Sequence, residues 1–428
     1  MEREKLIEGK MKIVWLDKHD PDRFVIVEAK DFVSARDGLC YAHIAEKGIE
    51  ATVTACNVFS ILEKCGEATA YQARVGEREF RANRCTMFPY ELIVRREACG
   101  SYLRRHPNVK RGTRFLRPQL EILLKTAKRE WNGIQLVSDD PLVVFQGYSG
   151  RGRGDVVASL YRPDRPIEDQ KPFLELSDYP LAENDHTYEI VCRSAVRSFL
   201  ILEKCWEMLG LPLVDMKAEF GLTPDGRVVL ADAIDNDCWT VLQGAEHLDK
   251  RAYGTGATLT HVGERYREVS RLTRLFRAPR QCITVWLPSE DDDILPFTTA
   301  LSRHSYNGRG GDVVMNLVRT TSDHGCDAVL AELQDMVGDG LERVIIFRGD
   351  RFGQLGRSVE RHSPFPVVFV PKADAPEPAS ESVSTVAVEM SPEDAAVRDA
   401  LRILAERNPR LWADLQLQCL GFDNLSLG

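Results

Sequence analysis

Residues 213–239, LVDMKAEFGLTPDGRVVLADAIDNDCW, decide the expected fold of the first half of this chain. Two apolar runs, Leu213–Phe220 and Arg227–Ile234, flank a Thr-Pro-Asp-Gly sequence at 223–226. Proline and glycine in that order are typical of a tight turn, and apolar runs on both sides of a turn are typical of paired strands. The stretch therefore predicts a β-hairpin.

Ionisable side chains occupy one face of this predicted hairpin. Because side chains two positions apart share a face of a strand, Asp215, Lys217 and Glu219 lie together. The second strand adds Asp232 and then an acidic cluster at 235–237. Carboxylates of this kind hold Mg²⁺ beside nucleotide phosphates, and a lysine balances the charge of a transferred phosphoryl group. The face therefore indicates a catalytic site rather than a purely structural surface.

Two basic segments suggest anion binding. In Glu8-Gly9-Lys10-Met11-Lys12 the glycine lets backbone N–H groups approach an anion, and the two lysines share a strand face. Residues 95–118 hold eight lysines and arginines against one acid, and Arg95 and Ser101 flank a glycine, which gives a guanidinium fork and a hydroxyl as is common where phosphates bind. A solvated hairpin and a solvated helix face are the respective alternatives.

The composition is that of a soluble globular protein. The chain has 428 residues, of which 43% are hydrophobic and 28% are charged, so we expect two or three domains and exclude a disordered or fibrous chain. A net charge of −9 argues against nucleic-acid binding, and the sequence contains neither an apolar run of membrane-spanning length nor a secretory signal. The 11 cysteines lack metal-ligand spacing and predict reduced, partly buried thiols in the cytoplasm.

The remaining pattern divides the chain into two halves. In the first half, apolar periodicity predicts strands within residues 1–35 and at 85–94, where Pro89 indicates an edge or hinge strand. Helices are expected at 51–65, 188–210 and 258–280. Residues 128–185, with their Gly/Arg-rich piece at 147–155, predict a flexible surface excursion that is too short in Gly/Arg sequence to indicate RNA binding.

The second half alternates between strands and helices. Short all-apolar runs such as CITVWLP and RVIIFRG are typical of buried parallel strands, with a helix expected at Asp327–Val337. The alternation predicts a doubly wound α/β domain. A mobile loop is expected at 372–384, and a helix is expected over 391–417 with Ser391 as its N-cap.

These segments together resemble SAICAR synthase (phosphoribosylaminoimidazole-succinocarboxamide synthase). The resemblance covers residues 1–275 and rests on LIEGKMK, MFPYELIVRREACGSYLRR, LVDMKAEFG and LADAIDNDCW, in this order. Residues 281–428 resemble, more distantly, the AIR carboxylase that follows the synthase in the bifunctional purine enzyme of animals. That part rests on QCITVWLPSEDD, VRTTSDHG, VIIFRGDRFGQLG and PFPVVFVP. The chain is therefore expected to be a divergent paralogue of the bifunctional enzyme.

The resemblance implies both a fold and a reaction. The fold would be an α+β, two-lobed domain of the ATP-grasp-like or kinase-like kind, followed by a three-layer, flavodoxin-like α/β domain. The reaction would be an ATP-dependent ligation, in which ATP phosphorylates a carboxylate on an imidazole ribotide and the amine of L-aspartate displaces the phosphate to form an amide. The implied cofactors are ATP and Mg²⁺. The implied partners are these small molecules and further copies of the chain, joined through the C-terminal domain as a homo-oligomer.

The resemblance also assigns roles to residues of this chain. Lys217 and Asp215 would be catalytic, and Glu219 and Asp232 would lie around Mg²⁺. The residues that would hold the nucleotide are Lys10, Lys12, Met87, Glu91 and Glu219. The residues that would hold the other substrates are Arg95, Ser101, Asp31, Asp140, Asp235 and Asp237. Of these, Arg95 and Ser101 would grip the 5′-phosphate of the ribotide.

Departures from the family pattern gather on the substrate side. Thr126 and Ala127 replace two aspartates of a Glu-x-x-x-Lys-Asp-Asp stretch, and Thr240 replaces the arginine of Ser-x-Arg, whose serine is Cys238. Further replacements are Thr52-Val53 for Asn-Lys, and Arg251 and Gly254 for the glutamine and arginine of Asp-Lys-Gln-x-x-Arg. Because the nucleotide side is better retained, we expect an active ligase with an altered acid or amine.

The carboxylase-like half departs further. Pro288-Ser289-Glu290-Asp291 stands where the family has a Gly-Ser-x-Ser-Asp phosphate loop, and Arg348-Gly349-Asp350-Arg351 stands for its Ala-Gly-Arg loop, although His324 is kept. A rigid proline and an added carboxylate suit an anion poorly. This half is therefore expected to lack carboxylase activity and to serve as an assembly core.

Two other functions fit the same sequence. One is a nucleotide-binding pseudoenzyme that scaffolds the bifunctional purine enzyme, and the other is a kinase that acts on a small acid. Retention of the five residues Lys10, Lys12, Lys217, Glu219 and Asp232 favours chemistry, because a scaffold has no need of a Mg²⁺ site.

Overall fold

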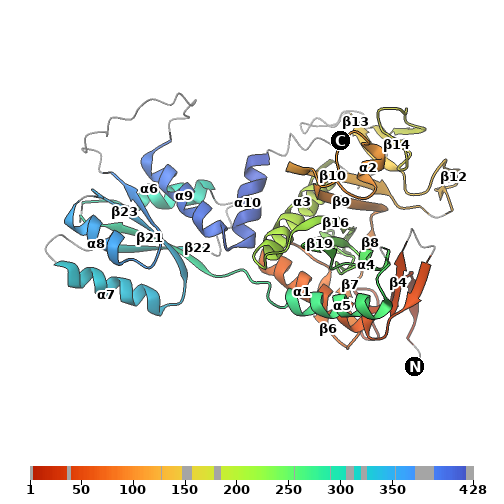
Figure 1. Ribbon diagram of the computed structural model, residues 1–428, viewed down its shortest axis with the longest axis horizontal. Coiled ribbons are helices and arrows are strands. Elements are labelled where there is room, and N and C mark those ends of the chain that lie inside the picture. Colours follow the sequence, from red (N-terminus) through yellow and green to blue (C-terminus); the bar gives the residue numbers. More distant parts are fainter. Residues whose placement is uncertain are drawn as a thin grey trace. The chain divides into compact units, whose positions relative to one another are not determined.

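The computed structural model forms two compact units (Figure 1). The second comprises Ala278–Gln418, and the first comprises the residues up to Arg277 together with Cys419 and Leu420. The structure describes residues 3–35, 40–126, 128–146, 157–177, 185–254, 256–289, 291–304, 313–319, 325–351, 353–371 and 390–420. Several sequence-based expectations fall outside these residues, namely the Gly/Arg-rich piece at 147–155, the replacements Ala127 and Glu290, the retained His324 and the loop at 372–384.

The first unit begins with a five-stranded antiparallel sheet in the order β1-β2-β3-β7-β6. The strands are β1 (Lys5–Glu8), β2 (Lys12–Leu16), β3 (Phe24–Ala29), β6 (Tyr71–Arg74) and β7 (Glu79–Asn83). Helix α1 (Lys47–Lys64) packs on β3, β6 and β7 and against α5 (Leu259–Thr273). The expected strands within 1–35 and the expected helix at 51–65 are confirmed, and α5 confirms the first part of the helix expected at 258–280. A hairpin of β4 (Phe32–Ala35) and β5 (Cys40–His43) follows β3.

A sheet of eight strands forms the larger part of this unit, in the order β15-β14-β13-β10-β9-β16-β19-β20. The strands are β9 (Tyr90–Glu97), β10 (Arg114–Leu124), β13 (Leu142–Gln146), β14 (Val157–Tyr161), β15 (Leu174–Ser177), β16 (Leu213–Ala218), β19 (Trp239–Gln243) and β20 (Glu246–His247). Helix α3 (Asp185–Glu207), expected at 188–210, packs on β9, β10 and β16 (Figure 1). The alternate residues Leu92, Val94 and Met216 are buried beneath it, and Arg96 pairs with Glu203 of α3. The opposite face of the three strands is therefore left for polar side chains.

The expected hairpin at 213–234 is only partly formed. The pairing across the turn is confined to β17 (Phe220–Leu222) and β18 (Val228–Leu230), whereas β16 pairs with β9 and β19. The chain leaves the large sheet at Glu219 and enters a three-stranded sheet of order β18-β17-β8. Gly221 makes this possible, because a Cβ there would lie 2.8 Å from Cβ of Cys85 beside β8 (Thr86–Met87).

The strand expected at 85–94 is likewise divided. It forms β8 in the small sheet and β9 in the large sheet, and Pro89 lies between them. Proline cannot donate to a ladder, so it interrupts pairing at this point. β8 is the edge strand of the small sheet and β9 is central in the large sheet, so the edge prediction holds only for the first part of this segment. Pro89 marks the passage from one sheet to the other, and the hinge alternative stays a prediction. The chain thus passes between the small sheet and the large sheet twice, from β8 to β9 and from β16 to β17. These two passages lie side by side, since the N–H of Phe88 donates to the carbonyl of Phe220 at 3.0 Å.

The surface excursion expected at 128–185 is also corrected. Its described parts contain β13, β14 and β15, which form one side of the large sheet. They also contain a small hairpin of β11 (Glu130–Trp131) and β12 (Ile134–Gln135). The apolar runs of β13 and β14 are short and separated by charged sequence, which hid their pairing. The short helices α2 (Tyr102–Arg105) and α4 (Arg251–Gly254) complete this unit.

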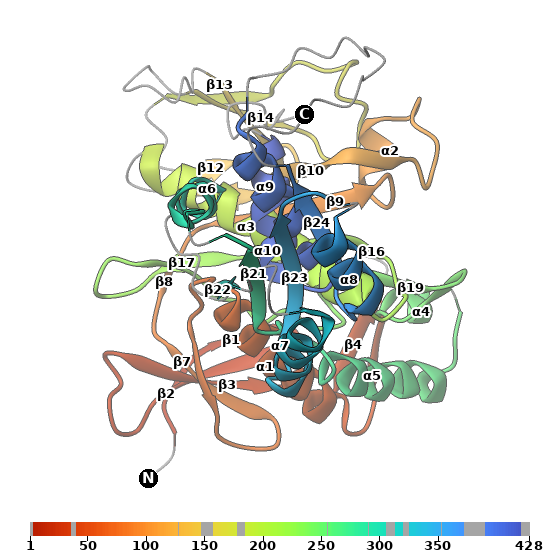
Figure 2. The ribbon, with the colours of Figure 1, turned by 90° about the vertical axis from the view of Figure 1, so that its left-hand side faces the viewer.

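The second unit alternates between strands and helices as expected. Its sheet is parallel throughout, in the order β22-β21-β23-β24, and Figure 2 looks onto β21 and β23, which run side by side. The elements are β21 (Gln281–Leu287), α6 (Leu295–His304), β22 (Val313–Arg319), α7 (Gly325–Gly338), β23 (Glu342–Arg348), α8 (Gln354–His362), β24 (Val367–Val370), α9 (Pro392–Ala405) and α10 (Pro409–Leu420).

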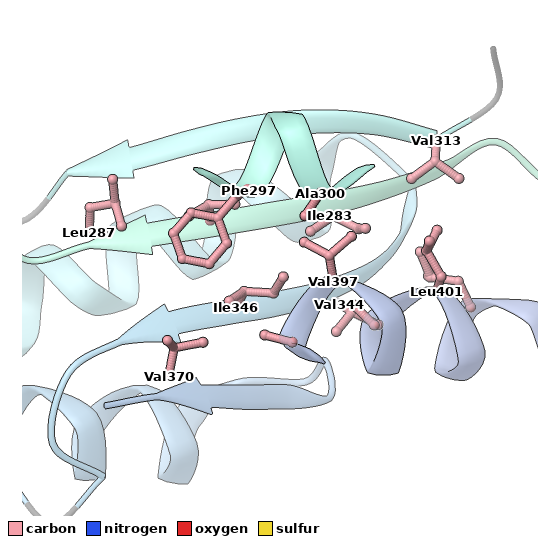
Figure 3. Packing of buried hydrophobic residues seen from close by; sticks show 14 residues of the cluster. Ile283, Leu287, Phe297, Ala300, Val313, Val344, Ile346, Val370, Val397 and Leu401 are labelled. Carbon is pink, nitrogen blue, oxygen red and sulfur yellow. The ribbon is translucent and has the colours of Figure 1, made fainter. Parts of the chain in front are cut away.

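Both faces of this parallel sheet are apolar. On one face Ile283, Val344 and Ile346 pack against α6 and α9, as Figure 3 shows. On the other face Trp286 and Phe347 pack with buried residues of α7 and α8. The sheet therefore lies between two layers of helices.

The helix expected over 391–417 is two helices. Ser391 caps α9 as expected, because its side chain accepts the N–H of Asp394. The helix ends at Ala405 because Pro409 cannot donate to the preceding turn. The buried Asn408 caps α10 by accepting the N–H groups of Arg410 and Leu411.

The described part of the chain contains no helix with the length and apolarity that a membrane crossing needs. Among the described cysteines, Cys56, Cys192, Cys238 and Cys282 are buried thiols, as expected.

Candidate functional site

The face of the large sheet opposite α3 carries ionisable side chains at alternate positions of three neighbouring strands. In the register of β9 and β16, Asp215 lies opposite Arg95 and Lys217 lies opposite Ile93. The side chains on this face are Glu121 and Lys125 at the end of β10, Glu91 and Arg95 of β9, and Asp215, Lys217 and Glu219 at the end of β16. The expectation that the last three share a face is confirmed by the partners that they contact.

A first group, here called the lysine cluster, comprises Lys12, Lys125, Lys217, Glu91, Glu219 and Asp232. Lys217 Nζ lies 3.2 Å from Glu219 Oε1 and 3.4 Å from Glu91 Oε2. Lys125 pairs with the other oxygen of Glu219. Lys12 reaches from the N-terminal sheet to Asp232 Oδ1 at 3.1 Å and to the carbonyl of Ala233 at 3.2 Å. The cluster therefore brings a lysine of the N-terminal five-stranded sheet together with ionisable side chains of the large sheet.

The lysine cluster is partly open to solvent. The exposed fractions of the side chains are 17% for Lys12, 29% for Lys217 and 47% for Lys125. Burial alone would lower the pKa of Lys217, but the surrounding acidic groups outweigh burial and raise it well above its usual value. Burial raises the pKa of Glu91, with Lys217 opposing. Three cations accessible to solvent can thus exchange their carboxylate partners for an anionic ligand.

A second group, here called the arginine cluster, comprises Arg95, Arg105, Arg251, Glu121 and Asp215. Arg95 Nε lies 2.6 Å from Glu121 Oε2, and Arg95 Nη1 lies 2.5 Å from Asp215 Oδ2. Arg105 pairs with the other oxygen of Glu121. Arg251 Nη2 lies 3.1 Å from Asp215 Oδ2. Each carboxylate therefore holds two guanidinium groups.

The two carboxylates of this buried cluster, Asp215 and Glu121, keep their negative charge. Burial would raise the pKa of Asp215, but Arg251 and Arg95 outweigh burial and hold it below its usual value. Arg95 and Arg105 do the same for the pKa of Glu121. Arg95 also donates to Ser101 Oγ at 3.1 Å, so the two residues predicted to bind a phosphate are in contact, while that role stays a prediction. Asp215, predicted to be catalytic, lies in this cluster and orients its arginines.

The acidic loop after β18 is held from the N-terminal sheet and its helices. Lys47 Nζ lies 2.7 Å from Asp237 Oδ2, and the hydroxyl of Tyr266 donates to Asp237 Oδ1 at 2.9 Å. Burial would raise the pKa of Asp237, but Lys47 outweighs it and holds the pKa low. Asp235 lies in the same surroundings, and burial raises its pKa. Lys47 and Tyr266 were missed by the sequence reasoning, because no local motif marks either of them.

Four other predicted residues lie at the edges of this site. Lys10 is exposed in the turn between β1 and β2, and Met87 is 44% exposed on β8. Asp31 is buried, pairs with Arg78 at 2.6 Å and accepts the N–H of Gly48. Asp140 is exposed and accepts the N–H of Thr126 at 2.9 Å. The structure thus brings Lys12 and Glu91 to the lysine cluster and leaves Lys10, Met87 and Asp31 outside its contacts.

The replaced residues have specific partners. Thr126 Oγ1 donates to Asp139 at 3.2 Å, so two carboxylates, Asp139 and Asp140, lie beside the position where the family has aspartates. Thr240 Oγ1 donates to Asp215 Oδ1 at 2.5 Å. Cys238 Sγ donates to the carbonyl of Ala233 at 3.2 Å, and burial raises its pKa to about 12, so the thiol is neutral.

The donor set of the lysine cluster suits Mg²⁺ that is shared with phosphates. No group of three or more metal-ligating side chains is found among the described residues. Mg²⁺ bound with nucleotides, however, takes only one or two protein carboxylates and completes its shell with phosphate and water oxygens. Glu219 and Asp232 can supply those carboxylates once their lysine partners turn to phosphate oxygens.

Comparison with known proteins identifies similar sequences for both units. Residues 5–143 and 163–271 match the family model described as SAICAR synthetase. The phosphoribosylaminoimidazole-succinocarboxamide synthase of Herpetosiphon aurantiacus is 32% identical over 281 residues, which cover 64% of this chain and 98% of that protein. The bifunctional phosphoribosylaminoimidazole carboxylase/phosphoribosylaminoimidazole succinocarboxamide synthetase of Rattus norvegicus is 28% identical over 435 residues, 96% of this chain and 92% of that protein. The solved structure of a phosphoribosylaminoimidazole-succinocarboxamide synthase from Ehrlichia chaffeensis is 24% identical and covers 64% of this chain and 100% of that chain with a TM-score of 0.48.

Proposed function

Because the chain belongs to the SAICAR synthetase family, we propose that it is an ATP-dependent ligase that joins a carboxylic acid to L-aspartate or a related amine through an acyl phosphate. The observation that carries the proposal is the lysine cluster. Lys12, Lys125 and Lys217 meet three carboxylates on a partly open sheet face, as a phosphoryl-transfer site requires.

The residues of this face divide the work of two steps. First, a carboxylate oxygen of the acid attacks the γ-phosphorus of ATP and ADP leaves, while Lys12 and Lys217 stabilise the charge of the transferred group. Second, the amine nitrogen attacks the acyl carbon, phosphate leaves, and the nitrogen releases a proton to solvent as the amide forms. Mg²⁺, bound through Glu219 and Asp232, would neutralise part of the phosphate charge.

The proposed nucleotide contacts extend to the N-terminal sheet and to β8. Lys10 would approach the phosphates from its turn, and the Met87–Glu91 segment would hold adenine through its backbone. The N-terminal sheet and the large sheet would form the two lobes of the ATP-grasp-like or kinase-like domain that we propose for residues 1–275. The acid and the amine would lie between the arginine cluster and the acidic residues Asp31, Asp140, Asp235 and Asp237.

We further propose that the substrate site has diverged. Thr126 and Thr240 interrupt the family pattern, and each now hydrogen-bonds a carboxylate of this chain. A hydroxyl that replaces a charged group changes the charge that a substrate meets. The acid or the amine joined would therefore differ from those of the purine enzyme.

For residues 281–428 we propose an AIR carboxylase-like, flavodoxin-like domain without carboxylase activity. The strand order β22-β21-β23-β24 begins as the flavodoxin-like order does, and the similarity to the rat protein extends over this part. Ligands of such sheets bind beyond the carboxyl ends of the strands. Here Arg319 donates to the carbonyls of Ser289 and Asp292, and Arg348 pairs with Asp292 and Glu393. These contacts occupy the edge of the sheet where a ligand would bind. We therefore propose that this domain serves as the core of a cytoplasmic homo-oligomer.

One assay separates the ligase from its alternatives. The full chain is incubated with ATP, Mg²⁺, L-aspartate and carboxylated aminoimidazole ribotide, and the products are identified by mass. A ligase forms the amide together with ADP and phosphate, and a slow reaction that accelerates with another acid or amine supports the diverged site. A kinase forms the acyl phosphate or its hydrolysis products without amide, and a pseudoenzyme scaffold binds ATP without turnover. Amide formation with these substrates at ordinary enzyme rates would overturn the altered-substrate proposal alone.

A further inference from the structure

Arg251 differs from the other arginines of the arginine cluster in its exposure. The exposed fraction of its side chain is 37%, whereas the side chains of Arg95 and Arg105 are 3% and 0% exposed. Arg95 therefore forms buried ion pairs with Glu121 and Asp215, and Arg105 forms a buried ion pair with Glu121. Arg251 pairs with Asp215 and still presents part of its guanidinium to solvent.

The backbone and the side chain of Arg251 are both held in place. Its N–H donates to Asp249 Oδ1 at 2.8 Å, and the fully buried Asp249 also contacts His247 Nδ1 and the N–H of Val241. At the other end, Nη2 lies 3.1 and 3.3 Å from the two oxygens of Asp215. A guanidinium fixed at both ends loses little conformational entropy when it binds an anion.

Gly100 lies where two of these guanidiniums converge. A Cβ at Gly100 would lie 3.9 Å from Arg251 Nη2 and 3.9 Å from Arg95 Nη1. The φ angle of Gly100 is 55°, in the left-handed region that favours glycine, so backbone rather than a side chain faces the two groups. Ser101 follows, and its hydroxyl accepts from Arg95. A tetrahedral anion at this point would meet the exposed N–H groups of Arg251 and the hydroxyl of Ser101.

Position 240 lies beside Asp215 but supplies no cation that could bind an anion there. Thr240 is 2% exposed, and its hydroxyl is committed to Asp215. It provides no positive charge, although β19 brings it next to the same carboxylate that holds Arg251. Arg251 approaches that carboxylate from α4 instead.

We propose that Arg251 binds the phosphate group of a sugar-phosphate substrate above Gly100, and that it determines the preference for a phosphorylated acid. This rests on the proposed ligase function, because it concerns the acid that the ligase activates. Asp215 acts as a positioning residue that aims Arg251 at the anion.

Binding measured without ATP tests this inference separately from turnover. Ribose 5-phosphate and ribose are titrated calorimetrically into the full chain and into Arg251→Gln, Arg251→Lys and the double variant Thr240→Arg/Arg251→Gln. We expect Arg251→Gln to weaken ribose 5-phosphate binding roughly ten- to hundredfold. Arg251→Lys should lie in between because lysine lacks the fork, and the double variant should recover most of the affinity.

Arg267→Gln is the matched control, because Arg267 is 51% exposed, lies in the same unit and pairs with Glu46. It should leave ribose 5-phosphate binding unchanged. The inference is overturned if wild type binds ribose as well as ribose 5-phosphate, or if Arg251→Gln binds ribose 5-phosphate normally. It is also overturned if Arg251→Gln loses ADP binding and thermal stability to the same extent, since the role would then be structural. Absence of amide synthesis with retained, Arg251-dependent ribose 5-phosphate binding would defeat the ligase proposal alone.

Discussion

The lysine cluster and the arginine cluster both include side chains from one face of the large sheet, but they differ in burial. Glu121 and Asp215 are 4% and 5% exposed in their side chains, and they hold Arg95 and Arg105, which are almost fully buried. Glu91 is 26% exposed and faces a lysine that is also partly open. Exposed pairs contribute little to stability, whereas removing one partner of a buried pair is costly. One face thus combines a fixed framework with pairs that a ligand can replace.

The largest effect is expected from Glu121→Gln. This change leaves Arg95 and Arg105 buried with only a neutral amide between them, so we expect a loss of about 3–5 kcal/mol in the free energy of unfolding. Urea denaturation measures it, with Glu91→Gln as the matched control that should shift stability by less than about 1 kcal/mol. Equal effects of the two variants would show that the clusters do not differ as described.

The next effect concerns activity. We expect Lys217→Met to lower kcat about 10²–10³-fold, because the transferred phosphoryl group loses a preorganised charge partner. Its stability should change by less than about 1 kcal/mol, since Lys217 is 29% exposed. Steady-state ADP release and thermal unfolding give the two measurements, and Lys64→Met, at an exposed lysine of α1, serves as control. A stable variant with unchanged kcat would remove the lysine cluster from the mechanism.

The smallest effect is a pH dependence of opposite sign in the two clusters. The folded-state pKa of Glu121 is lowered, so its stabilising contribution is present above about pH 4.3 and is lost as pH falls through the folded pKa. The folded-state pKa of Glu91 is raised, so Glu91 begins to lower the free energy of unfolding as pH rises through about 4.3.

We therefore expect the stability of Glu91→Gln relative to wild type to rise as pH increases above about 4.3, and the stability deficit of Glu121→Gln relative to wild type to shrink as pH falls below about 4.3. Urea midpoints measured on both sides of this pH provide the test. Parallel profiles for the two variants would contradict the assignment.

The sequence predicted the part of this site that depends on local periodicity. The two-residue period placed Asp215, Lys217 and Glu219 on one face, and the helical period identified α3 beneath it. The predicted partner of the strand that begins at Leu213 was wrong, because the turn at 223–226 indicates pairing only between residues that are close in sequence. β16 instead pairs with β9, more than a hundred residues earlier.

The partners of the charged residues needed the three-dimensional structure. The guanidinium of Arg95 meets Glu121 and Asp215, which come from different strands. Arg251 could be noticed as a departure from the family pattern, but its contact with Asp215 depends on how α4 follows β20. Lys47 reaches Asp237 from α1 and carries no motif of its own. Long-range ion pairs of this kind leave no periodic trace in a sequence.

The double crossing between the two sheets has a consequence for how this gene can change during evolution. The segment from Leu213 to Leu222 serves the large sheet up to Ala218 and the small sheet from Phe220. One inserted or deleted codon between Asp215 and Glu219 would turn the following side chains to the opposite face and place a charge beneath α3. Descendants of this chain can therefore exchange residues here one at a time, but they inherit the length of the segment unchanged.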